Sequence, residues 1–320
     1  MSSASKGDRT ETAWSEERRR ALPKVEYRDN EMGVVQSTTP AAVAAAAGLV
    51  SQGKIYDLDA GRWPGMPLFA GHPQFSVTTY RNAQGFRIQH DLDDWLGENR
   101  VETAFTSELI IGTMHTGTHL DGLCHTTCGH DSEWYGGYRS AEALGNFGPT
   151  RAEASSIAPF VCRGLLLDAA GARGVDALDG CHPIDLDDME RTLARAGKQV
   201  RPGDAVLFRT GYMKYWAVDP EKAAAHHGAG ITLEVAQALA DAGVCLVGSD
   251  TETVEREPSL DPYNPQPVHI ELLIRRGVHL LELAHLEDLA RDGVSEFMFV
   301  CLPLRIRGAT GSMVRPMAIV

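Results

Sequence analysis

The chain has 320 residues, of which 43% are hydrophobic and 23% charged, a balance typical of a globular protein. It carries 43 acidic and 30 basic residues, and the resulting net charge of −13 disfavours binding to nucleic acid or to anionic membranes. No apolar stretch approaches the roughly 18 to 20 residues of a membrane span, and the N-terminus lacks the apolar run of a secretory signal. We therefore expect a cytoplasmic protein.

The six cysteines do not form the short-spaced framework of a disulfide-rich protein, and we expect free thiols. Cys124 and Cys128 lie close to His125 and His130, which raises the alternative of a structural zinc site. That site would lack the paired C-x-x-C or H-x-x-x-H units that such centres use. We interpret both cysteines as small buried residues.

Residues 1–38 are polar and charged and show no apolar periodicity, so we expect an N-terminal arm that is disordered or wraps a partner subunit. Thr39 and Pro40 then provide a cap and a first helical residue for an alanine-rich helix that Gly48 ends. From there to the C-terminus we expect a single domain, residues 39–320.

Strand-like and helical segments alternate along this domain. Amphipathic helices are predicted around 186–196 and from Thr232 to Gly243, whereas 66–100 is rich in turn-forming residues and predicts loops and antiparallel strands. The strand-like runs cover residues 54–58, 164–168, 205–210, 244–247, 278–281, 297–302 and 314–320. The pattern predicts an α/β fold, a compact mixed sheet with flanking helices.

The densest set of metal-ligand residue types lies in the string HTGTHLDGLCH, which contains His115, His119, Asp121 and His125. Imidazole and carboxylate groups offer the nitrogen and oxygen donors that suit Zn²⁺ or Mn²⁺, and a small ligand set leaves positions open for water and substrate. A polar loop whose histidines only satisfy backbone groups is the alternative. The number of histidines within so few residues favours a metal centre.

Two further residues of the string have predicted supporting roles. Gly117 permits a tight backbone approach between the first two histidines. The Thr118 hydroxyl is predicted to orient a metal ligand or the bound water.

The string His-x-Gly-Thr-His-x-Asp-x-x-x-His resembles the signature of the metal-dependent cyclase family, which includes bacterial kynurenine formamidases and isatin hydrolases. The resemblance extends from about residue 41 to 320 and includes RGLLLDA, PGDAVLFRTGY, VGSDT and GATGSMVRPMAI. The chain has Leu123 where most members have proline, so the loop behind the metal is expected to differ. The resemblance implies a mixed α/β domain of the swivelling β/β/α type that assembles as a homodimer or homotetramer.

The resemblance also implies roles for the residues of the string. His115, His119 and Asp121 would bind a first divalent ion. His125 would be the acid/base residue beside the reacting carbonyl. One or two ions per chain are expected.

Two-metal members of the family add a histidine and a glutamate, and here His269 and Glu282 lie in HIELLIRRGVHLLE. If 269–276 is helical it advances roughly 11 Å, and a reversal at Gly277 followed by a strand returns roughly 13 Å, so both side chains could face one site. Alternatively, His269 lies on a helix surface and Glu282 at a solvated strand end.

Aromatic residues near the signature and in family-like segments are candidates to line a pocket for a planar substrate, although core packing is the default for each. They are Trp63, Phe69, Trp134, Tyr135 and Tyr212.

The sequence thus predicts a hydrolase that cleaves an amide, imide or lactone bond in a small cyclic or aryl-linked substrate by metal-activated water. A metal-dependent cyclase or lyase needs the same Lewis acid and base, and remains an alternative. A metal-bearing binding protein without turnover is a second alternative, which the presence of His125 disfavours.

Overall fold

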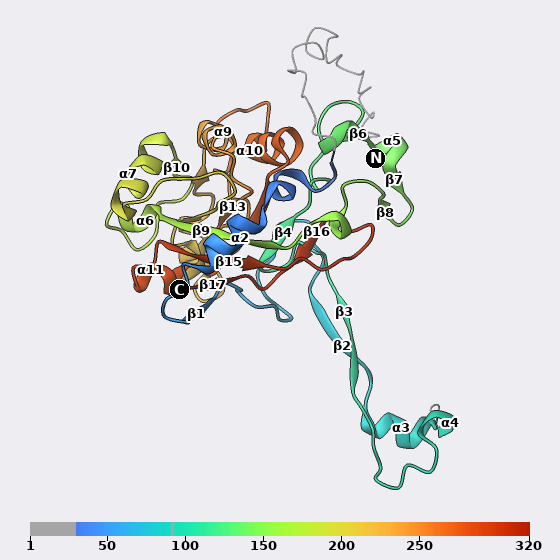
Figure 1. Cartoon of the computed structure of the whole chain (residues 1–320). Coiled ribbons are helices and arrows are strands. Elements are labelled where there is room, and N and C mark those ends of the chain that lie inside the picture. The colour runs from blue at the N-terminus through green and yellow to red at the C-terminus, as the bar shows by residue number, and fades with distance from the viewer. Residues whose placement is uncertain (1–29, 91–92) are drawn as a thin grey trace, which may run out of the picture.

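A nine-stranded mixed sheet runs through the computed structural model, which describes residues 30–90 and 93–320 (Figure 1). Its strands are, in spatial order, β1 (Ile55–Asp57), β17 (Met317–Ile319), β15 (Glu296–Cys301), β9 (Phe160–Asp168), β11 (Ala205–Arg209), β13 (Leu246–Ser249), β14 (His279–Glu282), β4 (His119–Asp121) and β16 (Gly311–Met313). The chain is therefore a mixed α/β protein, as predicted.

The centre of the sheet is parallel and its borders are antiparallel. Strands β9, β11, β13 and β14 run parallel, while β15, β17, β1, β4 and β16 add antiparallel neighbours. All five residues of β11 are buried, as expected for a strand covered on both faces. Every predicted strand-like run overlaps one of these strands. The short strand β4, which carries part of the metal-ligand string, was not predicted.

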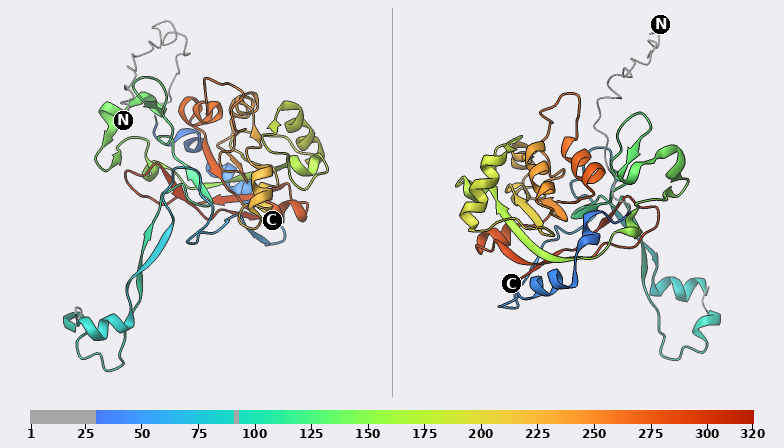
Figure 2. Two further views of the ribbon diagram at one scale, coloured as in Figure 1. Left: turned by 180° about the vertical axis from the view of Figure 1, so that it is seen from behind. Right: turned by 45° about the horizontal axis from the view of Figure 1, so that its top comes forward.

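Helices cover both faces of the sheet (Figure 2). Helix α2 (Pro40–Ala47) packs on β9 and β15, and its cap residue Thr39 accepts a hydrogen bond from the backbone N–H of Ala42. The opposite face carries α7 (Leu186–Ala196), α9 (Leu233–Asp241), α10 (Pro267–His269) and the π-helix η5 (Ile270–Arg276). The predicted helices α2, α7 and α9 are confirmed.

The remaining elements are short and lie mostly at the sheet ends. They are η1 (Gly33–Ser37), β5 (Glu133–Trp134), η2 (Tyr135–Gly137), β6 (Tyr138–Arg139), α5 (Ser140–Ala143), β7 (Leu144–Gly145), β8 (Gly148–Pro149), η3 (Ala154–Ser156), α6 (Ala169–Ala172), β10 (Pro183–Ile184), η4 (Tyr212–Lys214), α8 (Pro220–His226), β12 (Gly230–Ile231) and α11 (Glu287–Arg291). None of the helices in the described ranges has the length and apolar character needed to cross a membrane.

A long hairpin (residues 76–111) projects from the body of the molecule (Figures 1 and 2). Strands β2 (Ser76–Arg81) and β3 (Ser107–Ile111) pair antiparallel, and helices α3 (Ala83–Gln89) and α4 (Asp93–Leu96) lie at its tip. The antiparallel strands were predicted, but the two helices were not. Large apolar side chains on the hairpin are exposed: Val77, Tyr80, Ile88, Trp95, Val101, Phe105, Leu109, Ile110 and Ile111.

The predicted N-terminal arm includes residues 33–37, but in the structure these residues form the short helix η1. Residues 1–29 lie outside the described residues, but η1 places Val34 and Val35 in the core, 8% and 3% exposed. The backbone N–H of Val34 donates to the carbonyl oxygen of Gly277 at 2.8 Å. The adjacent valines are too few to give an apolar period, which is why the sequence did not distinguish them from the polar segment.

Candidate metal centre and pocket

The pairing of β4 with β14 places three ionisable side chains together. His119 and Asp121 are two residues apart on β4, so both point to one face of the sheet, and Glu282 lies directly opposite His119 in the antiparallel register. His119 Nε2 is 3.1 Å from Glu282 Oε2 and 3.6 Å from Asp121 Oδ1. All three side chains are buried.

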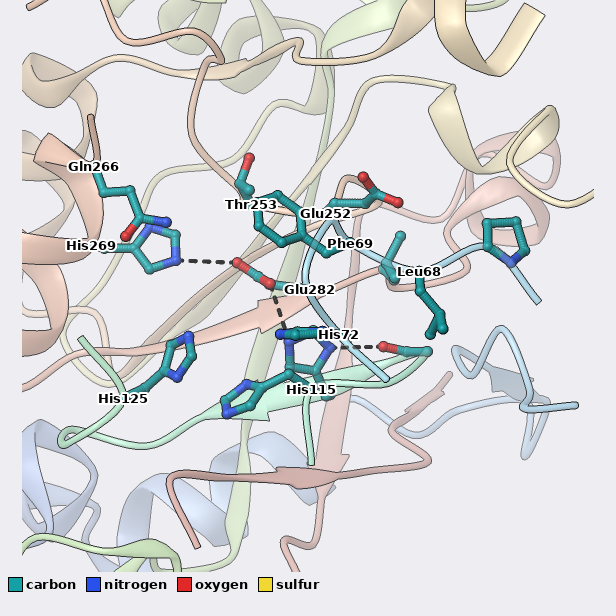
Figure 3. A pocket seen from close by; sticks show the side chains of 14 residues that line it. Leu68, Phe69, His72, His115, His125, Glu252, Thr253, Gln266, His269 and Glu282 are labelled. Carbon is teal, nitrogen blue, oxygen red and sulfur yellow. Dashed lines mark hydrogen bonds and ion pairs between the residues drawn. The ribbon is translucent and has the colours of Figure 1, made fainter. Parts of the chain in front are cut away.

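The turn at Gly277 brings His269 to the same place. The chain enters η5 after His269, reverses at Gly277 with φ of 67°, and returns along β14 to Glu282. His269 Nε2 lies 3.3 Å from Glu282 Oε1 (Figure 3). It is also 3.6 Å from Asp121 Oδ2. The helix, turn and strand geometry predicted for these two residues is therefore found, and both side chains are buried rather than solvated.

His115 and His125 also lie beside the Asp121 carboxylate. His115 Nδ1 is 2.8 Å from Asp121 Oδ1, and its Nε2 is 2.9 Å from Thr310 Oγ1. The ring of His125 stacks on that of His115 with centroids 3.8 Å apart. Asp121 is therefore shared by both groups of potential ligands.

The donor set of this cluster fits a divalent cation. Two groups of three bring one ligand atom from each residue within 4.8 Å of one another: His119, Asp121 and Glu282, and His115, Asp121 and His125. The buried atoms Asp121 Oδ2 and Glu282 Oε1 accept no hydrogen bond of good geometry from the described residues, and His269 Nε2 faces both, at 3.6 and 3.3 Å. A cation bound between these groups would satisfy both atoms.

The three residues predicted to hold the first ion lie together. His115 Nδ1 and His119 Nε2 both face Asp121 Oδ1, at 2.8 and 3.6 Å. The register of β4 against β14 also places Glu282 beside His119, which the sequence alone could not supply.

The charges of the cluster balance one another. Burial alone would raise the pKa of Asp121, but the imidazoles of His125, His115 and His269 hold it well below its usual range. Burial also opposes the charged form of His269, yet hydrogen bonds to Asp121, Glu255 and Glu282 raise its pKa well above the usual value. A cation would replace protons on such imidazoles, so metal binding is expected to release protons.

His125 is different, because burial lowers its pKa to about 4, and the neighbouring imidazoles of His115 and His269 add to the shift. The ring is therefore neutral at pH 7 and can accept a proton. Its proximity to Asp121 also makes it a potential metal ligand.

The two predicted supporting residues act differently from what the sequence suggested. The Thr118 hydroxyl donates to the carbonyl oxygen of Leu283 at 2.6 Å and accepts from the N–H of Ala60, so it braces the loop and does not orient a ligand. Strand alternation explains this, since Thr118 precedes His119 and faces away from it. Gly117 has φ of 61°, and a Cβ there would lie 2.7 Å from the carbonyl oxygen of Gly61. Its close approach is therefore to that loop, and its own carbonyl fixes the ring of His119 through Nδ1 at 2.8 Å.

A cavity of about 140 Å³ opens over the cluster (Figure 3). Its wall combines apolar side chains with polar ones and is formed by Pro67, Leu68, Phe69, His72, His115, Gly117, His119, His125, Glu252, Thr253, Gln266, His269, Glu282 and Leu283. The apolar side chains come from the loop after β1 and from Leu283, which follows β14 directly.

Of the five predicted pocket aromatics, the structure places only Phe69 in the cavity wall. Trp134 and Tyr135 are 2% and 1% exposed in the main core, and Tyr212 is buried in a second apolar cluster. Trp63 packs edge-on against Trp216 with ring centroids 5.8 Å apart. These four predictions are wrong because each ring is used in packing.

Sequence reasoning missed several residues of the site, including His72, Glu252 and Glu255. His72 stands alone in a loop, and Glu255 lies among the alternating acids of DTETVE, so neither had a recognisable ligand spacing. Glu255 is 1% exposed and accepts hydrogen bonds from the backbone N–H groups of Val268 (3.0 Å) and His269 (3.2 Å), and from His269 Nδ1.

The mixed sheet thus carries a buried cluster of histidines and carboxylates that could hold a metal ion. Residues 56–256 match the model of the cyclase family, described as "putative cyclase", and the chain belongs to that family. Among curated proteins, none matches the chain.

Solved structures support the same fold. The crystal structure of a novel cyclase superposes with a TM-score of 0.78 at 27% identity, covering 91% of this chain and 97% of that one. Isatin hydrolase A from Labrenzia aggregata, bound to benzyl benzoate, gives 0.59 at 21% identity, with 86% and 95% covered. A "potential metal-dependent hydrolase with cyclase activity" gives 0.51 at 23% identity, with 83% and 98% covered.

Proposed function

We propose that this protein is a metal-dependent hydrolase that cleaves an amide, imide or lactone bond in a small cyclic or aryl-linked substrate. The observation that carries the proposal is the buried cluster of histidines with Asp121 and Glu282, whose ligand atoms lie within 4.8 Å of one another in two groups of three beside the cavity. The family membership and the isatin hydrolases among the structural neighbours support the reaction class.

His115, His119, Asp121, His269 and Glu282 would hold one or two divalent ions, Zn²⁺ or Mn²⁺. An ion bound there would polarise the substrate carbonyl and lower the pKa of a water. His125 is placed to accept a proton from the attacking water as the water oxygen bonds to the carbonyl carbon. It then returns the proton to the leaving nitrogen or oxygen as the bond to carbon breaks.

The cavity selects a substrate with one flat apolar side. Phe69, Leu68 and Leu283 supply apolar wall, Glu252 lies beside Phe69, and Gln266 lies next to His269 on the other side of the cavity (Figure 3). A planar aryl amide or lactam fits this division, because its ring packs against apolar side chains while its carbonyl faces the cluster.

A substrate screen with metal analysis tests the proposal. Protein loaded with Zn²⁺ or Mn²⁺ is assayed against N-formyl aryl amines, isatin-like lactams, cyclic imides and unsaturated lactones in H₂¹⁸O. Hydrolysis places one ¹⁸O in the carboxylate product and stops after chelation. Full activity in a demonstrably metal-free preparation would contradict the proposal. Turnover without ¹⁸O uptake would favour a cyclase or lyase, and metal binding without any turnover a binding protein.

We further propose that the chain assembles with a second copy of itself through the hairpin. Its exposed apolar side chains are too numerous for a surface that stays in water. The body of the same chain offers a groove of about 470 Å³ at β15 and β16, where Leu302 and Leu304 are 58% and 54% exposed. A symmetric dimer buries both surfaces at once.

A further inference from the structure

Three buried polar atoms in and beneath the cavity make no hydrogen bond of good geometry with the described residues. Two are the carboxylate oxygens of Asp121 and Glu282, which a cation satisfies. The third is Nδ1 of His72, which no part of the proposed metal centre explains. A buried polar atom without a partner is unfavourable, so a ligand that reaches it gains a hydrogen bond at little desolvation cost.

The position of His72 suits contact with a substrate. It lies in the loop between β1 and β2, where its backbone N–H donates to the carbonyl oxygen of Phe69 at 3.2 Å, and its side chain lines the cavity. Its ring centroid is 6.0 Å from that of Phe69 and 6.2 Å from that of His115 (Figure 3). His72 belongs to neither candidate ligand group of the described residues.

We infer that His72 is a substrate-binding residue whose Nδ1 hydrogen-bonds an oxygen of the substrate's reacting carbonyl group. Phe69, on the same loop, packs against the adjacent ring of the substrate. The loop would then contact both the carbonyl group and the ring of the substrate, while His125 transfers the proton. This inference rests on the proposed function and adds a specificity residue to it.

Binding of benzohydroxamate to the Zn²⁺-loaded protein tests the inference without turnover. The hydroxamate carries a carbonyl oxygen and a metal-binding group but is not a substrate, so an absence of hydrolysis leaves this test intact. Isothermal titration compares the wild type with His72→Leu, His72→Asn and the control His130→Leu, a substitution at an exposed histidine outside the cavity wall. The side-chain amide nitrogen of asparagine takes nearly the same place as Nδ1 of histidine.

We expect roughly tenfold weaker binding for His72→Leu at unchanged zinc content, recovery in His72→Asn, and wild-type affinity for His130→Leu. With an active substrate, KM should rise in parallel. Wild-type affinity in His72→Leu would overturn the inference. So would equal losses in the Leu and Asn variants, which would show that shape and not the hydrogen bond matters. Loss of zinc from His72→Leu would make His72 a metal ligand instead.

Discussion

The carboxylate of Glu255 is hydrogen-bonded to Nδ1 of His269, the ring nitrogen that points away from Asp121 and Glu282. One oxygen, Oε1, faces His269 Nδ1, and the two backbone N–H groups at the start of α10 also donate to this carboxylate. Nδ1 therefore donates to Glu255, and Nε2 faces Asp121 and Glu282, where a bound cation would take the place of its proton. A histidine oriented by a carboxylate in this way is a typical arrangement at metal centres, because the second hydrogen bond fixes the ring and increases its basicity.

Replacing this carboxylate should weaken metal binding without removing a ligand. Glu255→Gln keeps the shape but offers His269 Nδ1 a weaker acceptor, and we expect a 10- to 100-fold loss of metal affinity. Competition with a chromogenic chelator measures it. Glu271→Gln is the matched control, because Glu271 is equally buried on η5 but pairs with Arg275 and Arg276. Equal losses in the two variants would mean that the effect is on the fold.

Glu282→Gln should lower the bound metal from about two ions per chain towards one. The variant removes the charge opposite His119 and leaves the His115 and His125 side of Asp121 intact. Elemental analysis after equilibration in excess metal gives the stoichiometry. Glu252→Gln, which alters a cavity carboxylate outside both ligand groups, should keep the wild-type value. A wild-type protein that saturates at one ion would refute the two-ion assignment.

Truncation at the N-terminus should lower the stability of the protein only when it removes η1. A chain that starts at Asn30 keeps η1 and should bind metal and unfold like the full protein. A chain that starts at Thr39 loses Val34 and Val35 from the core, at a cost of roughly 3 kcal/mol or more. Thermal unfolding distinguishes the two. Identical melting temperatures would show that η1 adds nothing to stability.

A charge placed on the hairpin should disrupt assembly. Ile110→Glu changes a side chain that is 62% exposed on β3, and we expect a shift towards monomer in light scattering. Val218→Glu introduces the same charge at an exposed valine outside the hairpin and should keep the wild-type mass. A wild-type protein that is monomeric at micromolar concentration would exclude the assembly we propose.

The sequence predicted those features that depend on local patterns. The cap at Thr39, the apolar period of α7, the apolar runs of the central strands and the ligand spacing of HTGTHLDGLCH are all local, and the structure contains each element. Features that depend on register or on distant packing were not accessible. The pairing of His119 with Glu282 comes from strand register, and Trp134 and Tyr135 were assigned to a pocket although they pack in the core.

The contact between Glu255 and His269 could not be predicted from the sequence either. Glu255 and His269 are 14 positions apart in the sequence, and nothing in the spacing of DTETVE singles out the third acid. Only the folded path of the chain, from β13 through the loop to α10, brings that carboxylate behind the imidazole.

His125→Asn should separate a catalyst from a metal-binding scaffold. His125 is half-buried and its pKa is lowered to about 4, chiefly by burial, so above this pH it is the uncharged, proton-accepting form. The usual histidine value is near 6.5, and the downward shift keeps the base available throughout the neutral range. An asparagine amide retains a polar group at this position but cannot take up a proton near pH 7.

We expect His125→Asn to keep its metal and its fold while kcat falls by about 10² to 10⁴, the usual size of general acid/base assistance. Metal content and kcat are measured on one preparation, with His130→Asn as the control at an exposed histidine. Loss of metal together with activity would make His125 a ligand, as its distance from Asp121 and His115 permits. Survival of activity would place the proton transfer on another group.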